Sequence, residues 1–512
     1  MLKSILFYDE ITIWWDKNEF GRAADCFKLS LNGAEVGETG KTHYTFSKLD
    51  ADKEYSIVIK AYACGKLISE REYSFKTKPQ RRRVDVTLPP YCAIGDGVTL
   101  NTETIQRALN EITDGEYLYF PRGVFRTGAL DVKSGTEIYF YEGALLQGSA
   151  RREDYLPKIL SRFEGTEMEC YRSLLNLGVL DHTNYGFTCE NVSIRGKGAI
   201  FGGGRPLAVD ILEYEKTQLK EFMDSNPEYV KTCENVDTIP GRARGRLINM
   251  SNCRNVVLSG LDMGYGPSWN IHFVYSKDIV TYNSRIWSFD TVDEEGNVIR
   301  ERVWNGDGWD PDSSEDCVIF DTSFHTGDDC IAIKSGKNPE GNLINRPTKN
   351  IYVFNCIAKA GHSVSIGSEM SGGVENVYIW DCDLKDCYYG VQVKGTKKRG
   401  GYVKNLQVTD SVIPSVFVRS VTYNDDGEAS LTPPVFSGFH FDNVDIVGTL
   451  QRGDQKAKDY VYLLGFDAEG YYVDEVTFNN VRLVDVDGDV ALKAQYVKKL
   501  IWENVSYVKT ER

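Results

Sequence analysis

Asn350–Val353 (Asn-Ile-Tyr-Val) and Asn376–Ile379 (Asn-Val-Tyr-Ile) are two copies of one unit, in which an asparagine or aspartate precedes a short apolar run. Further copies begin at Asn191, Asn255, Asp278, Asp316, Asn405 and Asn443. From the copy at 255 onward, neighbours lie 23, 38, 34, 26, 29 and 38 residues apart. A strand-like unit that repeats every twenty-odd residues, with variable insertions, is typical of a right-handed parallel β-helix. We therefore expect an all-β solenoid.

The spacing of three cysteines and two interruptions of the repeat add to this expectation. Cys330, Cys356 and Cys382 are each 26 residues apart, so they are predicted to stack in one interior column of the core. Residues 204–245, with a helix-prone piece around 213–223, and residues 290–302 interrupt the repeat. Insertions in a solenoid form loops on one face, and we expect these two to wall off one end of a cleft.

The chain divides into three predicted segments. Residues 1–78 alternate apolar and polar residues in short runs between turns, as a small antiparallel β-sandwich does, and they resemble a fibronectin type III module. Residues 79–83 are interpreted as a linker. Residues 84–512 are predicted to form the parallel β-helix domain. We expect its exposed first end to be covered by a helix that begins at Asn101 and Thr102 and has its apolar positions on one face. Those apolar positions are Ile105, Ala108, Leu109 and Ile112.

Composition excludes some classes of protein. The chain has 512 residues, 41% of them hydrophobic, and its formal net charge of −15 argues against nucleic-acid binding. No apolar run approaches the ~20 residues that cross a bilayer. The stretch 1–15 contains Asp9 and Glu10 and does not resemble a secretion signal. The twelve cysteines are scattered without a CxxC pair. We expect a cytoplasmic protein with reduced thiols, or a secreted one if a leader was trimmed.

Three carboxylates predict chemistry. Asp307, Asp328 and Asp329 lie within 23 residues, and a fold that buries them together places like charges where they shift each other's pKa. The first two are 21 residues apart, close to one coil, so they are expected on adjacent rungs. Adjacent strand residues face opposite sides. Both Asp328 and Asp329 reach a common cleft only if a bulge or turn at Gly327 interrupts the strand.

The carboxylates belong to a set of motifs with a known order. Asn305–Asp307 (Asn-Gly-Asp), Asp328–Asp329, Gly361–Ser363 (Gly-His-Ser) and Gln392–Lys394 (Gln-Val-Lys) follow one another. They resemble the Asn-x-Asp, Asp-Asp, Gly-His-Gly and Arg-x-Lys motifs of glycoside hydrolase family 28, the polygalacturonases. The resemblance covers about residues 84–512. The segment Ser365–Gly373 looks like that of bacterial exo-acting members, some of which carry a fibronectin-like domain in front.

This resemblance implies an inverting, exo-acting hydrolase of α-1,4-galacturonosyl bonds in pectic oligosaccharides. Asp328 is then the general acid, and Asp307 and Asp329 activate a water on the opposite face of the sugar. His362 hydrogen-bonds the carboxylates or the sugar, and Lys394 pairs with a uronate carboxylate. The implied substrate-binding residues are Asn305, His362, Gln392 and Lys394. We expect no cofactor, no metal, no nucleic-acid partner and no membrane association, and the oligomeric state stays open.

Two positions depart from the family pattern. Gln392 stands where the family has an arginine that grips a sugar carboxylate, and Ser363 replaces the second glycine of Gly-His-Gly. An arginine fork binds a carboxylate more strongly than a neutral amide does. A rhamnogalacturonan or a substituted pectin therefore remains an alternative substrate. The run Lys397–Arg399 is a candidate for replacing the lost positive charge.

Other residues near the motifs have structural alternatives. Asp310 and Asp312 are interpreted as loop or cap hydrogen-bonders, with Asp310 also placed to orient Asp307. His325 and Lys334 are each open between a structural role and a place beside the catalytic groups. The sequence also leaves two other classes of protein open. A polysaccharide lyase needs a calcium site and a basic residue, yet no arginine lies between Arg302 and Arg346. A carbohydrate-binding solenoid without catalysis does not need three convergent carboxylates.

Overall fold

The computed structural model describes residues 2–288, 302–449, 459–486 and 491–509. The chain forms two compact units, one of residues 1–83 with 114–117 and one of residues 84–113 with 118–512. No helix among the described residues is long and apolar enough to cross a membrane.

The N-terminal unit consists of two antiparallel sheets. One is formed by β1 (Lys3–Leu6), β2 (Glu10–Trp14) and β5 (His43–Ser47), and the other by β3 (Cys26–Leu31), β4 (Ala34–Thr39), β6 (Glu54–Ala63) and β7 (Lys66–Lys76). A short 3-10 helix, Lys17–Glu19, follows β2. Both sheets contribute to one apolar core, in which Ile13 and Phe46 come from the first sheet, Phe27 and Ile57 from the second, and Trp15 is fully buried. The predicted antiparallel sandwich is confirmed, and its assignment as a fibronectin type III module stays a prediction.

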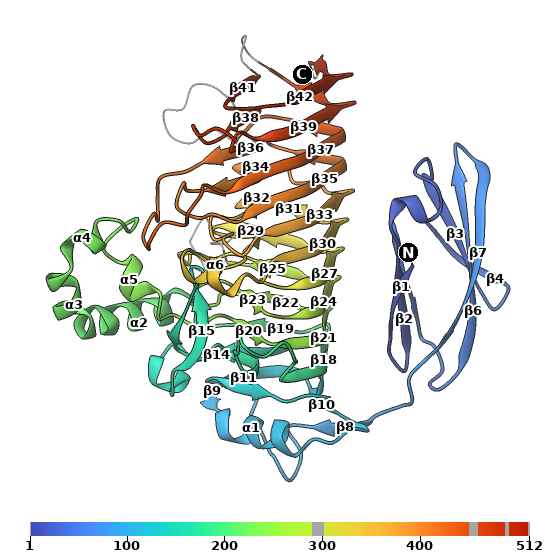
Figure 1. Cartoon of the computed structure of the whole chain (residues 1–512). Helices are drawn as coiled ribbons and strands as arrows, with labels where there is room; N and C mark the ends of the chain where they lie inside the picture. Colours follow the sequence, from blue (N-terminus) through green and yellow to red (C-terminus); the bar gives the residue numbers. More distant parts are fainter. Residues whose placement is uncertain (1, 289–301, 450–458, 487–490, 510–512) are drawn as a thin grey trace. The chain divides into compact units, whose positions relative to one another are not determined.

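The second unit is a parallel β-helix, whose strands stack rung upon rung in three long sheets (Figure 1). The first sheet contains β8 (Arg82–Asp85), β10 (Glu116–Phe120), β13 (Glu137–Phe140), β18 (Cys189–Gly196), β21 (Cys253–Ser259), β24 (Lys277–Tyr282), β27 (Glu315–Phe320), β30 (Thr348–Phe354), β33 (Val374–Trp380), β35 (Tyr402–Ile413), β37 (Val435–Ile446), β39 (Asp474–Asn479), β40 (Arg482–Val484), β42 (Leu500–Glu503) and β43 (Ser506–Val508). The second contains β9 (Asp96–Leu100), β11 (Gly123–Thr127), β14 (Ala144–Gly148), β19 (Ala199–Phe201), β22 (Asp262–Gly264), β25 (Arg285–Trp287), β28 (Ser323–His325) and β31 (Ile357–Ala358). The predicted all-β solenoid is confirmed.

The third sheet carries the motif residues. It contains β12 (Leu130–Val132), β17 (Leu175–Gly178), β20 (Ile248–Ser251), β23 (Ile271–Val274), β26 (Trp309–Asp312), β29 (Asp329–Ile333), β32 (His362–Ile366), β34 (Tyr389–Gly395), β36 (Val416–Ser420), β38 (Val461–Leu464) and β41 (Leu492–Gln495). In its register Asp329 pairs with His362 and His362 with Tyr389. Residues that are far apart in the sequence therefore become neighbours along one face.

The repeating asparagine marks a corner of each coil. Asn350, Asn376 and Asn405 have φ angles of 58°, 61° and 56°, in the left-handed region that asparagine tolerates better than most residues. Their side chains form a ladder: Nδ2 of Asn376 donates to Oδ1 of Asn350 at 3.0 Å, and Nδ2 of Asn405 donates to Oδ1 of Asn376 at 2.7 Å. Asparagine is thus favoured at this corner for two reasons: it tolerates the left-handed φ, and its amide forms the ladder of hydrogen bonds.

The prediction was wrong about the copy at Asn443. In the pairing of β35 with β37, Asn443 stands opposite Asp410 and donates to its Oδ1 at 2.6 Å. The position opposite Asn405 is occupied by Gly438, with φ 72°. Glycine reaches the left-handed region at no steric cost. The corner equivalent to Asn405 is therefore Gly438, which a search for asparagine or aspartate does not find, and the search matched Asn443 at a different corner five residues later.

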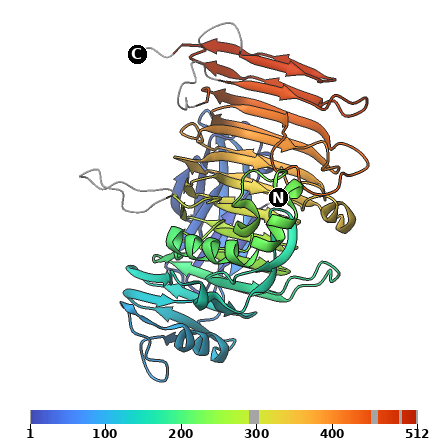
Figure 2. The same ribbon diagram turned by 90° about the vertical axis from the view of Figure 1, so that its left-hand side faces the viewer.

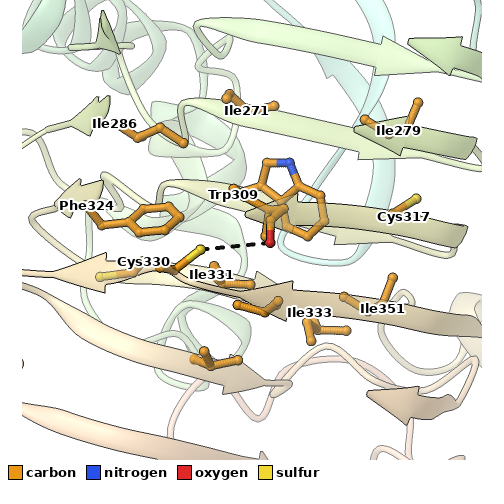
Figure 3. Packing of buried hydrophobic residues seen from close by; sticks show 14 of the residues in the cluster. Ile271, Ile279, Ile286, Trp309, Cys317, Phe324, Cys330, Ile331, Ile333 and Ile351 are labelled. Carbon is orange, nitrogen blue, oxygen red and sulfur yellow. Dashed lines mark hydrogen bonds between the residues drawn. The ribbon is translucent and has the colours of Figure 1, made fainter. Parts of the chain in front are cut away.

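The predicted column of three cysteines is also wrong. Cys356 and Cys382 follow the paired strands β30 and β33 and lie on successive coils. Cys330 instead lies in β29, in the third sheet, with its Sγ 4.0 Å from that of Cys387. The insertion that carries α6 (Glu340–Ile344) separates Cys330 from Cys356. Equal spacing along the sequence therefore does not place these two cysteines at equivalent positions of successive coils. Figure 3 shows Cys330 beside Trp309 in the apolar core.

Helices cover one end and one side of the β-helix. In α1 (Thr102–Glu111) Ile105, Ala108 and Leu109 are buried as predicted. Asn101 precedes the helix without capping it, because its Oδ1 accepts the N–H of Ile94 at 2.8 Å. The predicted helical insertion forms α2 (Gly204–Gln218), α3 (Lys220–Ser225), α4 (Pro227–Val230) and α5 (Thr238–Gly241), on one side of the stacked strands (Figure 2). A short 3-10 helix, Arg152–Tyr155, precedes the antiparallel hairpin of β15 (Ile159–Phe163) and β16 (Thr166–Cys170). Most of the predicted insertion at 290–302 lies outside the described residues.

Replacing Asn376 with alanine is expected to lower the free energy of unfolding by about 1–3 kcal/mol. Alanine loses both ladder hydrogen bonds and holds a left-handed φ at a steric cost of about 1–2 kcal/mol. Asn376→Gly is the matched control, since it loses the hydrogen bonds without that cost. Denaturant unfolding monitored by circular dichroism measures both. If the alanine variant is as stable as the glycine variant, the left-handed corner is not what selects asparagine.

Candidate active site

The seven residues predicted to form the site line one cavity of about 290 Å³. They are Asn305, Asp307, Asp328, Asp329, His362, Gln392 and Lys394. The cavity lies over the third sheet, where β26, β29, β32, β34 and β36 follow one another. Their individual roles in catalysis stay predictions, but the coiled backbone brings all seven together.

Asp329 is the most strongly paired carboxylate of the site. Its Oδ1 accepts a hydrogen bond from Ser365 Oγ at 2.7 Å and lies 2.9 Å from His362 Nδ1, while its Oδ2 lies 3.3 Å from Lys394 Nζ. Burial alone would raise the pKa of Asp329, but the charges and hydrogen bonds of Lys394 and His362 outweigh it and hold the pKa below its ordinary value. Asp329 is therefore an ionised carboxylate.

Asp328 has a more open environment than its neighbour. Strand β29 begins at Asp329, so Asp328 lies in the preceding turn, and both side chains reach the cavity. The side chain of Asp328 is 31% exposed and that of Asp329 is 5% exposed. Oδ1 of Asp328 accepts the backbone N–H of Asp329 at 2.9 Å and lies 3.4 Å from His362 Nδ1. Of the pair, Asp328 is the carboxyl group that an incoming ligand can reach.

Asp307 is buried beside a lysine that the sequence left undecided. Lys334 Nζ lies 3.3 Å from Asp307 Oδ2, 3.7 Å from Glu369 Oε2 and 4.4 Å from the centre of the Trp269 ring. Burial and the charge of Asp310 raise the pKa of Asp307 well above its ordinary value, although Lys334 opposes this. Sequence reasoning missed Trp269 and gave no role to Glu369, although Glu369 lies within the segment 365–373 that resembles exo-acting relatives.

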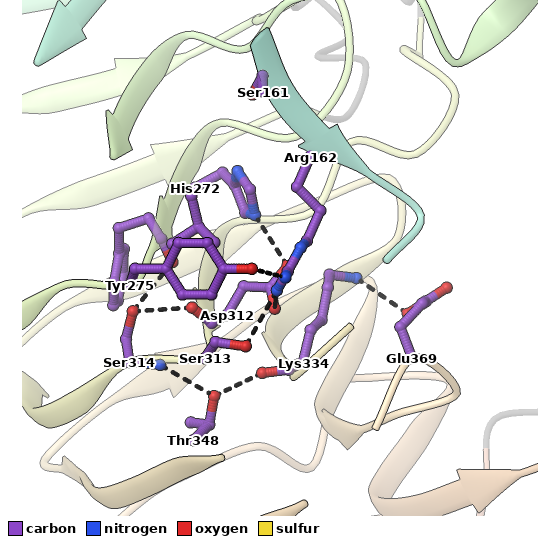
Figure 4. Close-up of polar contacts among 12 residues, drawn as sticks. Ser161, Arg162, His272, Tyr275, Asp312, Ser313, Ser314, Lys334, Thr348 and Glu369 are labelled. Carbon is purple, nitrogen blue, oxygen red and sulfur yellow. Dashed lines mark hydrogen bonds and ion pairs between the residues drawn. The ribbon is translucent and has the colours of Figure 1, made fainter. Parts of the chain in front are cut away.

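Asp310 and Asp312 lie in strand β26 and not in a loop, so that part of the interpretation was wrong. Neither carboxylate oxygen of Asp310 has a hydrogen-bond partner among the described residues, and burial raises its pKa. Asp312 accepts from Arg162 Nη1 at 2.8 Å and lies 3.3 Å from His272 Nε2 (Figure 4). Burial opposes ionisation of Asp312, but Arg162 and His272 lower its pKa to about 2. His325, in β28, packs on Trp287 and does not line the cavity.

The run Lys397–Arg399 does not replace the missing arginine. None of its three residues lines the cavity. Arg399 is fully buried and donates to Ser368 O and Asn338 Oδ1, while Lys398 Nζ donates to Asp425 O. The cation beside Gln392 is instead Arg419, from the next strand of the sheet, which the sequence gave no reason to select.

Asp328, Asp329 and His362 present three possible ligand atoms within 4.8 Å of one another, an arrangement that a metal ion can use. Burial lowers the pKa of His362, but its hydrogen bonds to the two aspartates and their charges raise it to about 9. A metal ion would have to displace the proton of this imidazole before it could coordinate there. The geometry is that of a cation held between two carboxylates.

Three connections form a wall along one side of the cavity. Glu164, Glu234, Tyr423 and Asn424 line the cavity from segments outside the third sheet. The N–H of Glu234 donates to Asn424 Oδ1 at 3.0 Å. Behind them, Arg242 pairs with Glu164 at 2.8 Å and with Asp426 at 3.1 Å, and Lys337 also pairs with Asp426 at 2.9 Å. Buried ion pairs thus join the hairpin β15–β16, the helical insertion and the loop after β36.

His362 gives the site a pH dependence that stability measurements can detect. Its pKa of about 9 in the folded protein lies above the ~6.5 of an unfolded histidine. Protonated His362 therefore stabilises the fold below about pH 6.5, and this contribution is lost as pH rises toward 9. We expect His362→Gln to lower the melting temperature most at pH 6 and least above pH 9. Calorimetry across this range measures it, and a deficit independent of pH would contradict the charged state.

Comparisons with known proteins agree with this geometry. The family model of glycosyl hydrolases family 28 matches residues 187–506. The exo-poly-alpha-D-galacturonosidase of Dickeya chrysanthemi is 24% identical over 466 residues, which cover 86% of this chain and 74% of the relative. The structure of the family 28 exopolygalacturonase of Yersinia enterocolitica superposes with a TM-score of 0.78 at 20% identity, over 99% of this chain and 98% of the other.

A second solved structure is similar in sequence as well as in fold. The hyperthermoactive exopolygalacturonase of Thermotoga maritima has a TM-score of 0.65 and 26% identity, over 83% of this chain and 91% of the other. The family match spans most of the coils and includes all seven residues predicted for the site. The chain is a glycoside hydrolase and belongs to glycosyl hydrolases family 28.

Proposed function

We propose that this enzyme is an exo-acting polygalacturonase that removes short products from the end of galacturonan chains by inverting hydrolysis. Relatives named for this activity match most of the chain. The observation that carries the exo assignment is the wall of the cavity. A cleft made by the coils alone lies open to a long chain, whereas here Glu164, Glu234 and Asn424 line it from loops joined through Arg242, so that less room is left for a chain that continues past the site.

The two aspartates of the pair have different environments, and these match two different roles. Asp329 is held ionised by Lys394 and His362, which suits a base that removes a proton from water. Asp328 is the more exposed member and is placed to donate a proton to the leaving oxygen. Asp307 carries a raised pKa and can hold the water by a hydrogen bond. Inversion follows from attack by this water on the face opposite the leaving group.

The cavity contains cations that can bind the carboxylate of an acidic sugar, among six carboxylates that also line it. Four cations, Lys334, His362, Lys394 and Arg419, line it together with the carboxylates. A galacturonosyl unit brings its own carboxylate, which such cations bind through charge-assisted hydrogen bonds. This argues for galacturonan ahead of a neutral or fully esterified pectin.

The time course of polygalacturonate digestion tests the proposal. We expect monomer or one short oligomer from the earliest samples and a slow fall in viscosity, because an end-acting enzyme shortens each chain stepwise. The first product should have the inverted anomeric configuration in proton NMR. A ladder of intermediate oligomers at early times would refute the exo assignment. New ultraviolet absorbance from an unsaturated product would indicate a lyase instead.

A further inference from the structure

One cation of the cavity differs from the other three in its pairing. Lys334 lies near Asp307 and Glu369, while His362 and Lys394 both pair with Asp329. Arg419 has no carboxylate partner among the described residues, and its Nε is buried there without a hydrogen-bond partner. Its positive charge is therefore the one that the protein itself leaves uncompensated beside the carboxylates of the site.

The position of Arg419 is fixed by its neighbours. In the pairing of β34 with β36, Arg419 stands opposite Lys394. The residues just before them, Val393 and Val418, are also paired and belong to the apolar core, so Arg419 and Lys394 face away from the core. The guanidinium carbon lies 5.0 Å from the centre of the Phe417 ring and 5.6 Å from that of Tyr389. Stacking against aromatic rings holds a guanidinium in a defined plane and leaves its edge free for hydrogen bonds. Arg419 is thus prepared to present a fork to the cavity.

Gln392 connects Arg419 to the carboxylate that we assign as the base. Nη2 of Arg419 donates to Gln392 Oε1 at 2.8 Å, and Gln392 Nε2 donates to Ser365 Oγ at 3.3 Å. Ser365 Oγ in turn donates to Asp329 Oδ1 at 2.7 Å. An arginine at position 392 has no acceptor to offer and would place a second positive charge against Arg419. Glutamine at 392 and arginine at 419 are therefore complementary.

We propose that Arg419 binds the carboxylate of the galacturonosyl unit held beside the carboxylates, and so determines specificity for the acidic sugar in place of an arginine at 392. The positively charged group then lies on β36, one strand further along the sheet than position 392 on β34, and Gln392 holds it in place through a hydrogen bond. This inference rests on the proposed function for the identity of the sugar.

Substitution of Arg419 separates recognition of the carboxylate from structural support. We expect Arg419→Met to lower kcat/KM for trigalacturonate about 10- to 100-fold, mainly through KM, the usual size of a lost charge-assisted hydrogen bond. The methyl ester of the same trimer should be affected less than threefold. Arg419→Lys, which keeps the charge without the fork, should fall between the two. Equal losses on acid and ester would show a merely structural role and overturn the inference.

A binding experiment tests the role of Arg419 even if the enzyme proves to have another substrate. Calorimetry on the intact protein compares D-galacturonate with D-galactose, which lacks the carboxylate. We expect tighter binding of the acid by the wild type and loss of this preference in Arg419→Met. A wild type that prefers the acid but hydrolyses no galacturonan refutes the proposed function and supports the inference. A variant that keeps the full preference refutes the inference alone.

The exchange of the two positions provides a second variant. Gln392→Arg alone should lower kcat/KM for trigalacturonate at least tenfold, since it brings two guanidinium groups together. The double variant Gln392→Arg/Arg419→Gln should recover much of that loss, because it restores one cation and one amide in the opposite order. Failure of the double variant to exceed the single one would contradict the proposed complementarity.

Discussion

Replacing Asp328 with asparagine is expected to lower kcat on trigalacturonate by about 10²- to 10⁴-fold, the range attributed to a positioned general acid or base. Asparagine has almost the same shape but cannot donate a proton that the leaving oxygen keeps. Because the side chain is 31% exposed and its polar neighbours among the described residues, the N–H of Asp329 and Nδ1 of His362, can both also approach the oxygen of an asparagine, the fold should be little affected. Steady-state kinetics with the melting temperature as a stability check measures this.

Two comparisons make the Asp328 result specific. Asp383→Asn is the matched control, since Asp383 is a surface carboxylate paired with Lys385 and lies outside the cavity; its kcat should stay within twofold of the wild type. A galacturonide with an activated aryl leaving group needs less proton donation, so the loss in Asp328→Asn should shrink on that substrate. An equal loss on both substrates would mean that Asp328 is not the acid.

The parts of the fold that could be predicted from the sequence are those that repeat locally. The asparagine corners at 350, 376 and 405 recur because each coil needs a left-handed residue at the same place. The same reasoning failed at Asn443 and Cys330, where a glycine corner and an insertion changed the phase. Which residues occupy equivalent positions on successive coils depends on how the strands pair. That pairing is decided by packing between coils rather than by spacing along the chain.

In the site, too, the residues that belong to sequence motifs could be predicted, whereas those placed by contacts between strands and loops could not. The seven motif residues line one cavity because they occur in a fixed order on successive coils. Trp269 and Arg419 were missed because neither belongs to a motif: Trp269 lies just before β23, and Arg419 reaches the cavity through the pairing of β34 with β36. Lys334 remained undecided, since a six-residue offset from Asp328 does not show which way a side chain points after an irregular turn. Only the pairing of strands supplies that direction.

A large loss of stability is expected when the buried network behind the site is broken. Arg162 is fully buried, and its Nη1 donates to Asp312 Oδ1 at 2.8 Å and to Ser313 Oγ at 3.0 Å (Figure 4). Its Nη2 donates to the hydroxyl of Tyr275. Arg162→Met leaves the Asp312 carboxylate buried without its main counter-charge. We expect a loss of about 3–5 kcal/mol in the free energy of unfolding, measured by denaturant titration at pH 7.

The pH dependence and a double variant identify the cause of this loss. The pKa of Asp312 is about 2 in the fold and ~3.9 in an unfolded chain, so the ionised carboxylate stabilises the protein above about pH 4, and this contribution is lost as pH falls toward 2. The deficit of Arg162→Met should therefore be largest at neutral pH and shrink below pH 4. Arg162→Met/Asp312→Asn removes the unpaired charge and should be more stable than Arg162→Met alone. If the double variant is instead less stable, lost packing around the Arg162 side chain, and not the stranded charge of Asp312, explains the effect.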